Sequence, residues 1–161
     1  MGFYGAPSAS DRAFSALAYL IPFSIGVLTF GQYLFNDFPV LQVLAIPAFP
    51  LILIYQSIPM GKFVVFLLLL FLVIRNTNIS YFIRFNVMQA LLLDIALIVS
   101  ALVLDLVPDS FSKSFIMETF YNMVFLATLA SVGYGIFKSI QGTLADEIPA
   151  ISEAARIQVR Y

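Results

Sequence analysis

Long, unbroken apolar runs dominate this chain, and they restrict it to a few kinds of fold. The run FVVFLLLLFLVI, residues 63–74, contains no polar residue, and 61% of the 161-residue chain is apolar while only 11% is charged. Soluble domains are nearer half apolar and a quarter charged, and so few charges could not cover a water-exposed surface. The apolar residues do not alternate with polar ones, as they would in an outer-membrane barrel. The chain is therefore predicted to be an all-α integral membrane protein.

Four segments are predicted to cross the membrane. A helix needs about 20 residues to span roughly 30 Å of hydrocarbon, and runs of that size stand between polar or Pro/Gly breaks. The first span is expected to start after a capping cluster of Ser10, Asp11 and Arg12. The predicted division is an N-terminal tail, 1–12, a transmembrane domain, 13–142, with spans at about 13–35, 59–76, 79–107 and 115–140, and a C-terminal tail, 143–161.

The segment between the first two spans is apolar enough to cross the membrane but rich in proline. Residues 38–59 contain prolines at positions 39, 47, 50 and 59, and an interior proline costs a helix roughly 3 kcal/mol and a backbone donor. We therefore expect a re-entrant or interfacial segment here, with residues 51–58 as a candidate extension of the second span. A fifth span is the alternative.

The distribution of charges favours four spans over five. With four spans, one side receives most of the basic residues: Arg12, Arg75, Arg84, Lys138, Arg156 and Arg160. The other side receives mainly acidic residues, with two lysines among them: Asp37, Asp105, Asp109, Glu118, Lys62 and Lys113. Because Lys and Arg accumulate on the cytoplasmic side, both termini are predicted to be inside, with Arg75 as an orienting residue.

The C-terminal tail is expected to contain a short amphipathic helix. Ile148, Ile151 and Ala155 recur at helical spacing, and Asp146 or Ser152 is a candidate cap. A frayed end is the alternative.

One acidic residue, Asp94, falls midway along the third span. An ionised acid there costs about 2.5 to 3.5 kcal/mol on insertion scales, so its side chain is expected to face the bundle interior or water. Arg84 and Asp105 lie about three helical turns away, and all three are predicted to share one broad face that avoids lipid. One interpretation is a polar strip along a pathway. The other is a buried, protonated acid that hydrogen-bonds a neighbouring helix.

The fourth span carries two further patterns. Glu118 and Asn122 are four residues apart and face one way near its start. They are candidates for a polar surface, although most such pairs near an interface are simply solvated. Ala127, Ser131 and Gly135 form a small-xxx-small ladder that allows close helix approach. We expect this ladder to serve packing, within the chain or against a partner.

Missing residue types exclude most chemistry. The chain has no cysteine and no histidine, so disulfides, thiolate chemistry and the commonest metal ligand and general base are absent. No carboxylate cluster in the sequence resembles a metal site. A net charge of −1 offers nucleic acid no basic surface. We therefore predict a protein that is not an enzyme, has no metal or cofactor, and does not bind nucleic acid.

Several segments together resemble a known family. VIRNTNISYFIRFNVMQALLLDI, residues 73–95, is similar to the core of the Tic twenty family, the membrane subunit of the translocon at the inner envelope of chloroplasts, with relatives in cyanobacteria and algal plastid genomes. Four other segments occur in the order that this family shows: ALAYLIP, FGQYLF, SFIMETF and EIPAISEAARIQVR. One departure is SIGVLTFG, residues 24–31, where the family would have an acidic residue and a proline.

The resemblance implies a four-helix protein with both termini in the stroma, acting on preproteins with other translocon membrane subunits in the lipid bilayer of the plastid inner envelope. A homo-oligomer is a further option. In a cyanobacterium the import role would not carry over.

Six polar residues match the family core: Arg75, Asn76, Arg84, Asn86, Gln89 and Asp94. We expect the last four to form a polar, partly hydrated surface against which an extended preprotein or a partner helix packs. A scaffold that holds other subunits together, and a small solute or ion channel, are the alternatives.

Overall fold

The computed structural model describes residues 6–108, 114–148 and 150–159, and within these ranges every regular element is a helix. Four of them are long and apolar enough to cross a membrane: Ala9–Phe30, Pro39–Ser57, Tyr81–Asp105 and Phe115–Gln141. The prediction of an all-α membrane protein with four candidate transmembrane helices is therefore confirmed. The second candidate is Pro39–Ser57 and not the predicted span 59–76, whose helix, Gly61–Ile74, is shorter. The elements in chain order are α1 (Ala9–Ala18), α2 (Leu20–Ile25), the π-helix η1 (Gly26–Phe30), α3 (Gln32–Asp37), the 3₁₀-helix η2 (Pro39–Ala48), α4 (Phe49–Ser57), α5 (Gly61–Leu68), the π-helix η3 (Leu69–Ile74), α6 (Tyr81–Asp105), α7 (Phe115–Gln141) and α8 (Ile151–Gln158).

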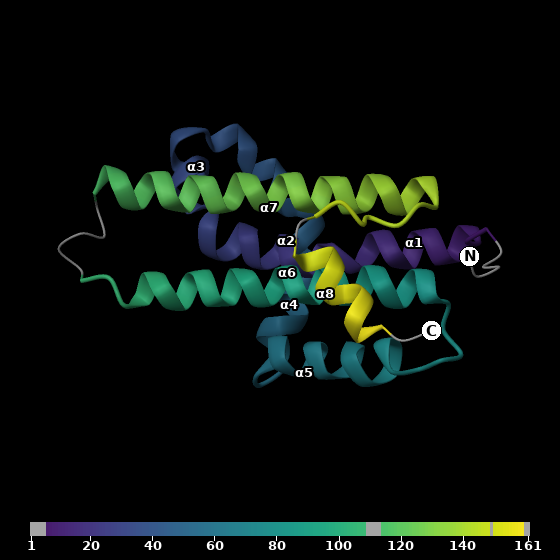
Figure 1. Ribbon diagram of the computed structural model, residues 1–161. Coiled ribbons are helices and arrows are strands. Elements are labelled where there is room, and N and C mark those ends of the chain that lie inside the picture. Colours follow the sequence, from purple (N-terminus) through teal and green to yellow (C-terminus); the bar gives the residue numbers. More distant parts are fainter. Residues whose placement is uncertain (1–5, 109–113, 149, 160–161) are drawn as a thin grey trace.

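The chain passes back and forth along the long axis of the bundle (Figure 1). α1, α2 and η1 run away from the N-terminus, α5 and η3 run back, and α6 and α7 repeat these two directions. Both termini and the turn between η3 and α6 therefore lie at one end, as the charge distribution predicted. Three charged residues used in that argument lie outside the described residues: Asp109, Lys113 and Arg160.

The first long helix starts and ends about one turn earlier than predicted. Its cap is Ser8 and not the Ser10 to Arg12 cluster. The Asp11 N–H donates to the Ser8 hydroxyl at 3.1 Å, and the Asp11 carboxylate accepts from the Ser8 N–H at 3.0 Å. This reciprocal capping box satisfies two backbone donors, so the helix begins at Ala9. At the other end, η1 stops at Phe30.

The proline-rich segment forms two short helices of its own. Pro47 lies inside η2 and Pro50 lies in the first turn of α4, where a missing N–H is tolerated. α4 then ends at Ser57, and Met60 adopts a left-handed φ of 54° before α5 begins. The expected continuation of residues 51–58 into the second span is therefore wrong, because this turn folds α5 back against α4.

α5 and η3 are shorter than a full crossing. Together they contain 14 residues, about 21 Å of helix at 1.5 Å per residue, compared with roughly 30 Å of hydrocarbon. In Figure 1 they lie beside the half of α6 that is nearer the termini. The predicted span 59–76 thus corresponds to a helix that covers only half of α6. The re-entrant interpretation of residues 38–59 stays a prediction.

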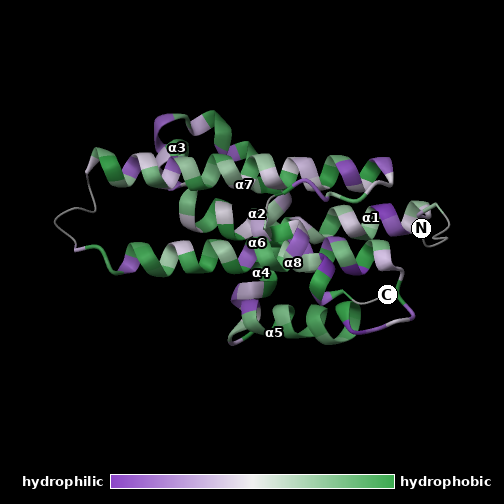
Figure 2. Ribbon diagram, in the orientation of Figure 1, coloured by the Kyte–Doolittle hydropathy of each residue, from purple (hydrophilic) through white to green (hydrophobic). Residues whose placement is uncertain are grey.

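The core is built around α1 and α2, which lie between α6 and α7 (Figure 1). Two glycines allow this close packing. A Cβ on Gly135 of α7 would overlap the ring of Tyr19, the residue between α1 and α2, and a Cβ on Gly26 of η1 would lie 2.8 Å from the Thr128 side chain of α7. Figure 2 shows hydrophobic residues predominating along α5 and hydrophilic ones in the turn that follows η3.

The C-terminal tail contains the expected short helix instead of a frayed end. α8 packs across α6 (Figure 1). Neither predicted cap is used, because the N-cap position is Ala150, which makes no side-chain bond. The Ser152 hydroxyl instead donates to the Ala145 carbonyl at 3.1 Å, and Asp146 pairs with Arg156 at 2.5 Å.

Candidate functional site

Residues 84–91 of α6 are buried on every side. α6 packs against α1, α2, η3 and α8, which together surround this stretch. The four predicted site residues on α6 share this burial: Arg84 is 6% exposed, Asn86 and Gln89 are 0% exposed, and Asp94 is 5% exposed. These side chains therefore lie inside the bundle and do not form an open surface.

The predicted shared face of Arg84, Asp94 and Asp105 is wrong at its far end. Asp105 is exposed, whereas Arg84 and Asp94 are buried. Asp105 is the last residue of α6, so it lies beyond the helices that enclose the middle of α6. The buried polar site ends at Asp94.

Asn86 joins three helices. The hydroxyl of Tyr19, the C-cap of α1, donates to the Asn86 Oδ1 at 3.0 Å, and the Ser139 hydroxyl of α7 donates to the same oxygen at 3.4 Å. The Asn86 Nδ2 donates to the Phe82 carbonyl at 2.8 Å. A buried amide with these partners is satisfied within the chain, so Asn86 serves assembly of the bundle.

Arg84 fixes the turn at the end that carries the termini. Its Nε donates to the Ile74 carbonyl at 2.8 Å, at the C-terminal end of η3, where a positive charge is favourable. Arg75, the predicted orienting residue, is exposed next to this turn, with its guanidinium 5.4 Å from the centre of the Phe71 ring. Arg84 is thus buried and holds the turn, whereas Arg75 lies at the surface.

Gln89 and Asp94 differ from their neighbours because their hydrogen-bonding capacity is unmet. Among the described residues, neither amide atom of Gln89 has a partner, and the same holds for Asp94 Oδ1. A buried polar group without a partner costs about 1–3 kcal/mol. Asp94 interacts electrostatically with Lys62 at the start of α5 and with Tyr55 of α4. Its side chain therefore lies on the α4 and α5 side of α6.

The four α6 residues do not form the single surface that was expected. Successive residues of a helix are rotated by about 100°, so Gln89 lies about 140° around α6 from Asp94. Asn86 faces α1 and α7 through its hydrogen bonds. α6 therefore carries two separate polar positions with unmet hydrogen-bonding capacity, Gln89 and Asp94.

Glu118 and Asn122 lie away from these positions. They are half-buried near the start of α7, and α7 runs antiparallel to α6 (Figure 1). Their turn of α7 is therefore beside the far end of α6, opposite the end that carries Arg84. The Asn122 Oδ1 is buried without a partner among the described residues. The structure does not bring this pair into one site with Arg84 and Asn86.

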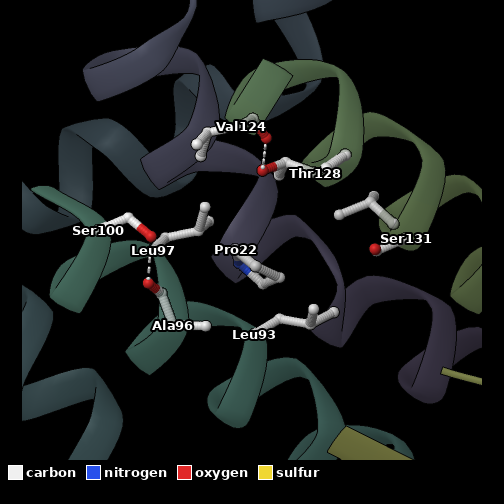
Figure 3. Close-up of a pocket in the computed structure, with 10 residues that line it drawn as sticks. Pro22, Leu93, Ala96, Leu97, Ser100, Val124, Thr128 and Ser131 are labelled. Carbon is white, nitrogen blue, oxygen red and sulfur yellow. Dashed lines mark hydrogen bonds between the residues drawn. The ribbon is translucent and has the colours of Figure 1, made fainter. Parts of the chain in front are cut away.

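A cavity of about 220 Å³ lies between α2, α6 and α7. Figure 3 shows Pro22 of α2 between the residues that α6 and α7 contribute. The Ser100 hydroxyl bonds the Ala96 carbonyl at 2.8 Å, and the Thr128 hydroxyl bonds the Val124 carbonyl at 2.7 Å. These two hydroxyls are thus occupied by their own helices, and Ser131 adds a third hydroxyl to a lining that is otherwise apolar.

The small-residue ladder of α7 divides between two roles. Ala127 and Ser131 line the cavity, whereas Gly135 is buried against Tyr19. The predicted close approach is therefore made by Gly135 within the ladder.

Sequence reasoning missed the residues that complete the polar interior. Tyr19 and Ser139 hold Asn86, and Lys62 interacts with Asp94. Tyr19 and Asn86 are 67 positions apart, so no local pattern indicates the pair. In the described part of the chain, no three acidic side chains gather as a metal site would require.

Beyond Asp94 the outer side of α6 is an uncovered apolar face. Five of its side chains are exposed: Ile95, Ile98, Val99, Leu102 and Val103. Ile98 is one turn from Asp94 and lies on the same side of the helix. α5 and η3 lie beside the half of α6 that is nearer the termini (Figure 1), so they do not cover this half.

A bundle of long apolar helices with both termini at one end and a few buried polar side chains defines a multi-pass α-helical membrane protein. The family described as "Chloroplast import apparatus Tic20-like" matches residues 5–155. The chain belongs to this Tic twenty family, as the sequence resemblance indicated.

Relatives come from cyanobacteria and from plastid-bearing organisms. The "Tic20 family protein" of Synechocystis sp. is 45% identical over 152 residues, covering 94% of both chains. "Protein TIC 20-v, chloroplastic" of Arabidopsis thaliana is 36% identical, covering 94% of this chain and 72% of the relative. The "Tic20 family protein Ycf60" of Porphyra purpurea is 35% identical, covering 93% and 76%. The protein is accordingly a multi-pass protein of a plastid envelope or of a cyanobacterial membrane.

Proposed function

We propose that this protein is a non-catalytic membrane subunit of a polypeptide-translocation complex, and that the polypeptide passes along the outer side of α6 beside Asp94. The observation that carries this proposal is the position of Asp94, a buried acid with an unmet oxygen at the edge of an exposed apolar helix face.

The side chains at this edge of the exposed α6 face suit contact with an extended polypeptide. A peptide group in hydrocarbon that lacks hydrogen bonds costs several kcal/mol, and an extended segment exposes such groups while a helix does not. The Asp94 carboxyl can accept from a peptide N–H, and the Lys62 ammonium, which interacts electrostatically with Asp94, can donate to a peptide carbonyl. The exposed side chains after Asp94 offer apolar contact to the side chains of the passing segment.

Membership in the Tic20-like family supports this role. The family is described by its place in a chloroplast import apparatus, so in a plastid the passing segment would be a preprotein, the partners would be other translocon membrane subunits, and both termini would lie in the stroma. In a cyanobacterium the same surface would serve an equivalent membrane complex without import into a plastid.

A scaffold is the second candidate, and the filled interior favours it. α1 and α2 occupy the space between α6 and α7, so the pathway cannot run through the middle of one copy. The exposed face of α6 would then hold a transmembrane helix of another subunit or of a second copy, and the protein would conduct nothing itself.

Substitution of Asp94 tests the proposal, with Asp105 as a matched acid on the same helix. The chain would replace the resident family member of a plastid or cyanobacterium, and transport of a precursor into a protease-protected space would be measured. Asp94→Ala should slow transport by about tenfold, the equivalent of roughly 1.4 kcal/mol, because it removes the acceptor beside the path. Asp105→Ala should have no effect, since this residue is exposed beyond the site. Equal transport by both variants would contradict the proposal.

A further inference from the structure

The side of α6 opposite Asp94 carries Phe85 and Gln89, and both side chains are fully buried. At about 100° per residue, Phe85 points about 180° away from Asp94. Asp94 lies on the side of α6 that faces α4 and α5, and Asn86 lies on the side that faces α1 and α7.

α8 also packs on α6, crossing in front of it in Figure 1. η3 lies on the Arg84 side of α6 through the Ile74 carbonyl, and α2 lies on the α7 side, where Pro22 faces Leu93 and Leu97 across the cavity. Since all its other neighbours are then placed, we assign α8 to the side with Phe85 and Gln89.

α8 packs on α6 but makes its side-chain hydrogen bonds to its own neighbours. In the described part of the chain, its side-chain hydrogen bonds go to residues 145–148: Ser152 bonds Ala145 and Ile148, and Arg156 bonds Asp146. The side chains that α8 and its C-cap bury are small, Ser152, Ala155 and Val159. α8 is therefore a self-contained unit that can leave α6 with few bonds broken.

The chain leading into α8 is strained. Ala150, its N-cap, has a φ of 62°, a conformation that a non-glycine residue adopts at a cost in free energy. Ala150 lies between residues 145–148 and α8, so this strained residue belongs to the same self-contained unit.

Gln89, which lies beneath α8, has unmet hydrogen-bonding capacity. Both Gln89 amide atoms lack a partner among the described residues. The Nε2 needs an acceptor and the Oε1 needs a donor. A single peptide group offers both, through its carbonyl and its N–H. In α8, as in any α-helix, these groups are already used by the helix, whereas an extended polypeptide has them free.

We propose that α8 is a displaceable cover, and that the face beneath it, with Phe85 and Gln89, binds an extended segment of another polypeptide whose peptide group pairs with the Gln89 amide. This inference rests on the proposed function, because it assigns a second contact for the same polypeptide. It adds that the contact is closed by the chain's own C-terminal helix in the resting state.

Labelling of a single thiol tests the cover, because the chain has no cysteine of its own. Gln89→Cys in the full chain in membranes should react slowly with a membrane-impermeant maleimide. Adding Ala155→Asp, which places a charge at the buried side of α8, should speed the reaction at least about tenfold by releasing the helix. Gln158→Asp on the exposed side of α8 should not change the rate.

A second thiol controls for general unfolding. Ala90→Cys is equally buried on α6 but faces away from α8, and its labelling should stay slow when Ala155→Asp is added. An unchanged rate at position 89 overturns the cover. A rise at both positions also overturns it, because the bundle as a whole would then have opened.

Crosslinking separates this inference from the proposed function. A photoreactive phenylalanine analogue would replace Phe85 or Ile98, and a precursor arrested by a folded domain at its C-terminus would be the probe. Crosslinks at both positions, stronger at Phe85 with Ala155→Asp, support the inference. Crosslinks at Ile98 without any at Phe85 overturn the inference and leave the proposed function standing. Crosslinks at neither position overturn both.

Discussion

At the scale of single residues, the two buried amides of α6, Asn86 and Gln89, have opposite effects on the stability of the fold. The Asn86 amide is held by Tyr19, Ser139 and the Phe82 carbonyl, whereas the Gln89 amide has no partner among the described residues. Both side chains are fully buried. Because a hydrogen-bonded amide stabilises and an unpaired one destabilises, burial alone does not say which residue supports the fold.

Substitution by leucine should separate these two amides. Asn86→Leu leaves the Tyr19 hydroxyl buried without its acceptor, so the free energy of unfolding should fall by about 2 kcal/mol. Gln89→Leu removes an unpaired group and should be neutral or stabilising. Unfolding of the two variants in the same detergent, followed by circular dichroism, measures both. Similar losses from the two substitutions would contradict this assignment.

At the scale of helices, close approach depends on particular glycines and not on the number of small residues. Gly135 is buried against the Tyr19 ring, while Gly133, on the same helix, has nothing within 4 Å of the place where a Cβ would be. These two positions on α7 therefore form a matched pair.

Alanine substitutions at the two glycines should have opposite effects. Gly135→Ala would force Tyr19 away from α7 and should cost about 1–3 kcal/mol of unfolding free energy. Gly133→Ala should stabilise by up to about 1 kcal/mol, because alanine favours the helix. Thermal unfolding in detergent reads out both. A stable Gly135→Ala protein would show that α1 and α7 do not require this approach.

At the scale of the whole molecule, composition and charge predict the class, while long-range contacts decide the site. The apolar runs predict an all-α membrane protein, and the basic residues predict both termini at one end. The sequence does not predict the left-handed turn at Met60 that separates α4 from α5, because its conformation depends on packing between the two helices. It also does not predict that Gln89 and Asp94 face different neighbours, since this depends on where α4, α5 and α8 dock.

α5 and η3 cover only the first half of α6, and this places Asp94 at the edge of the exposed apolar face. If α5 and η3 crossed fully, they would cover the second half of α6 as they cover the first. Instead the covered half ends near Lys62, and the apolar face after Asp94 is exposed.

The most direct test of this account is a structure of the native membrane complex with an arrested precursor in transit. We expect extended polypeptide density along the exposed face of α6, within hydrogen-bonding distance of the Asp94 carboxyl. Precursor density elsewhere, with this face covered by lipid or by a helix of another subunit, would contradict the account and leave the scaffold role in its place.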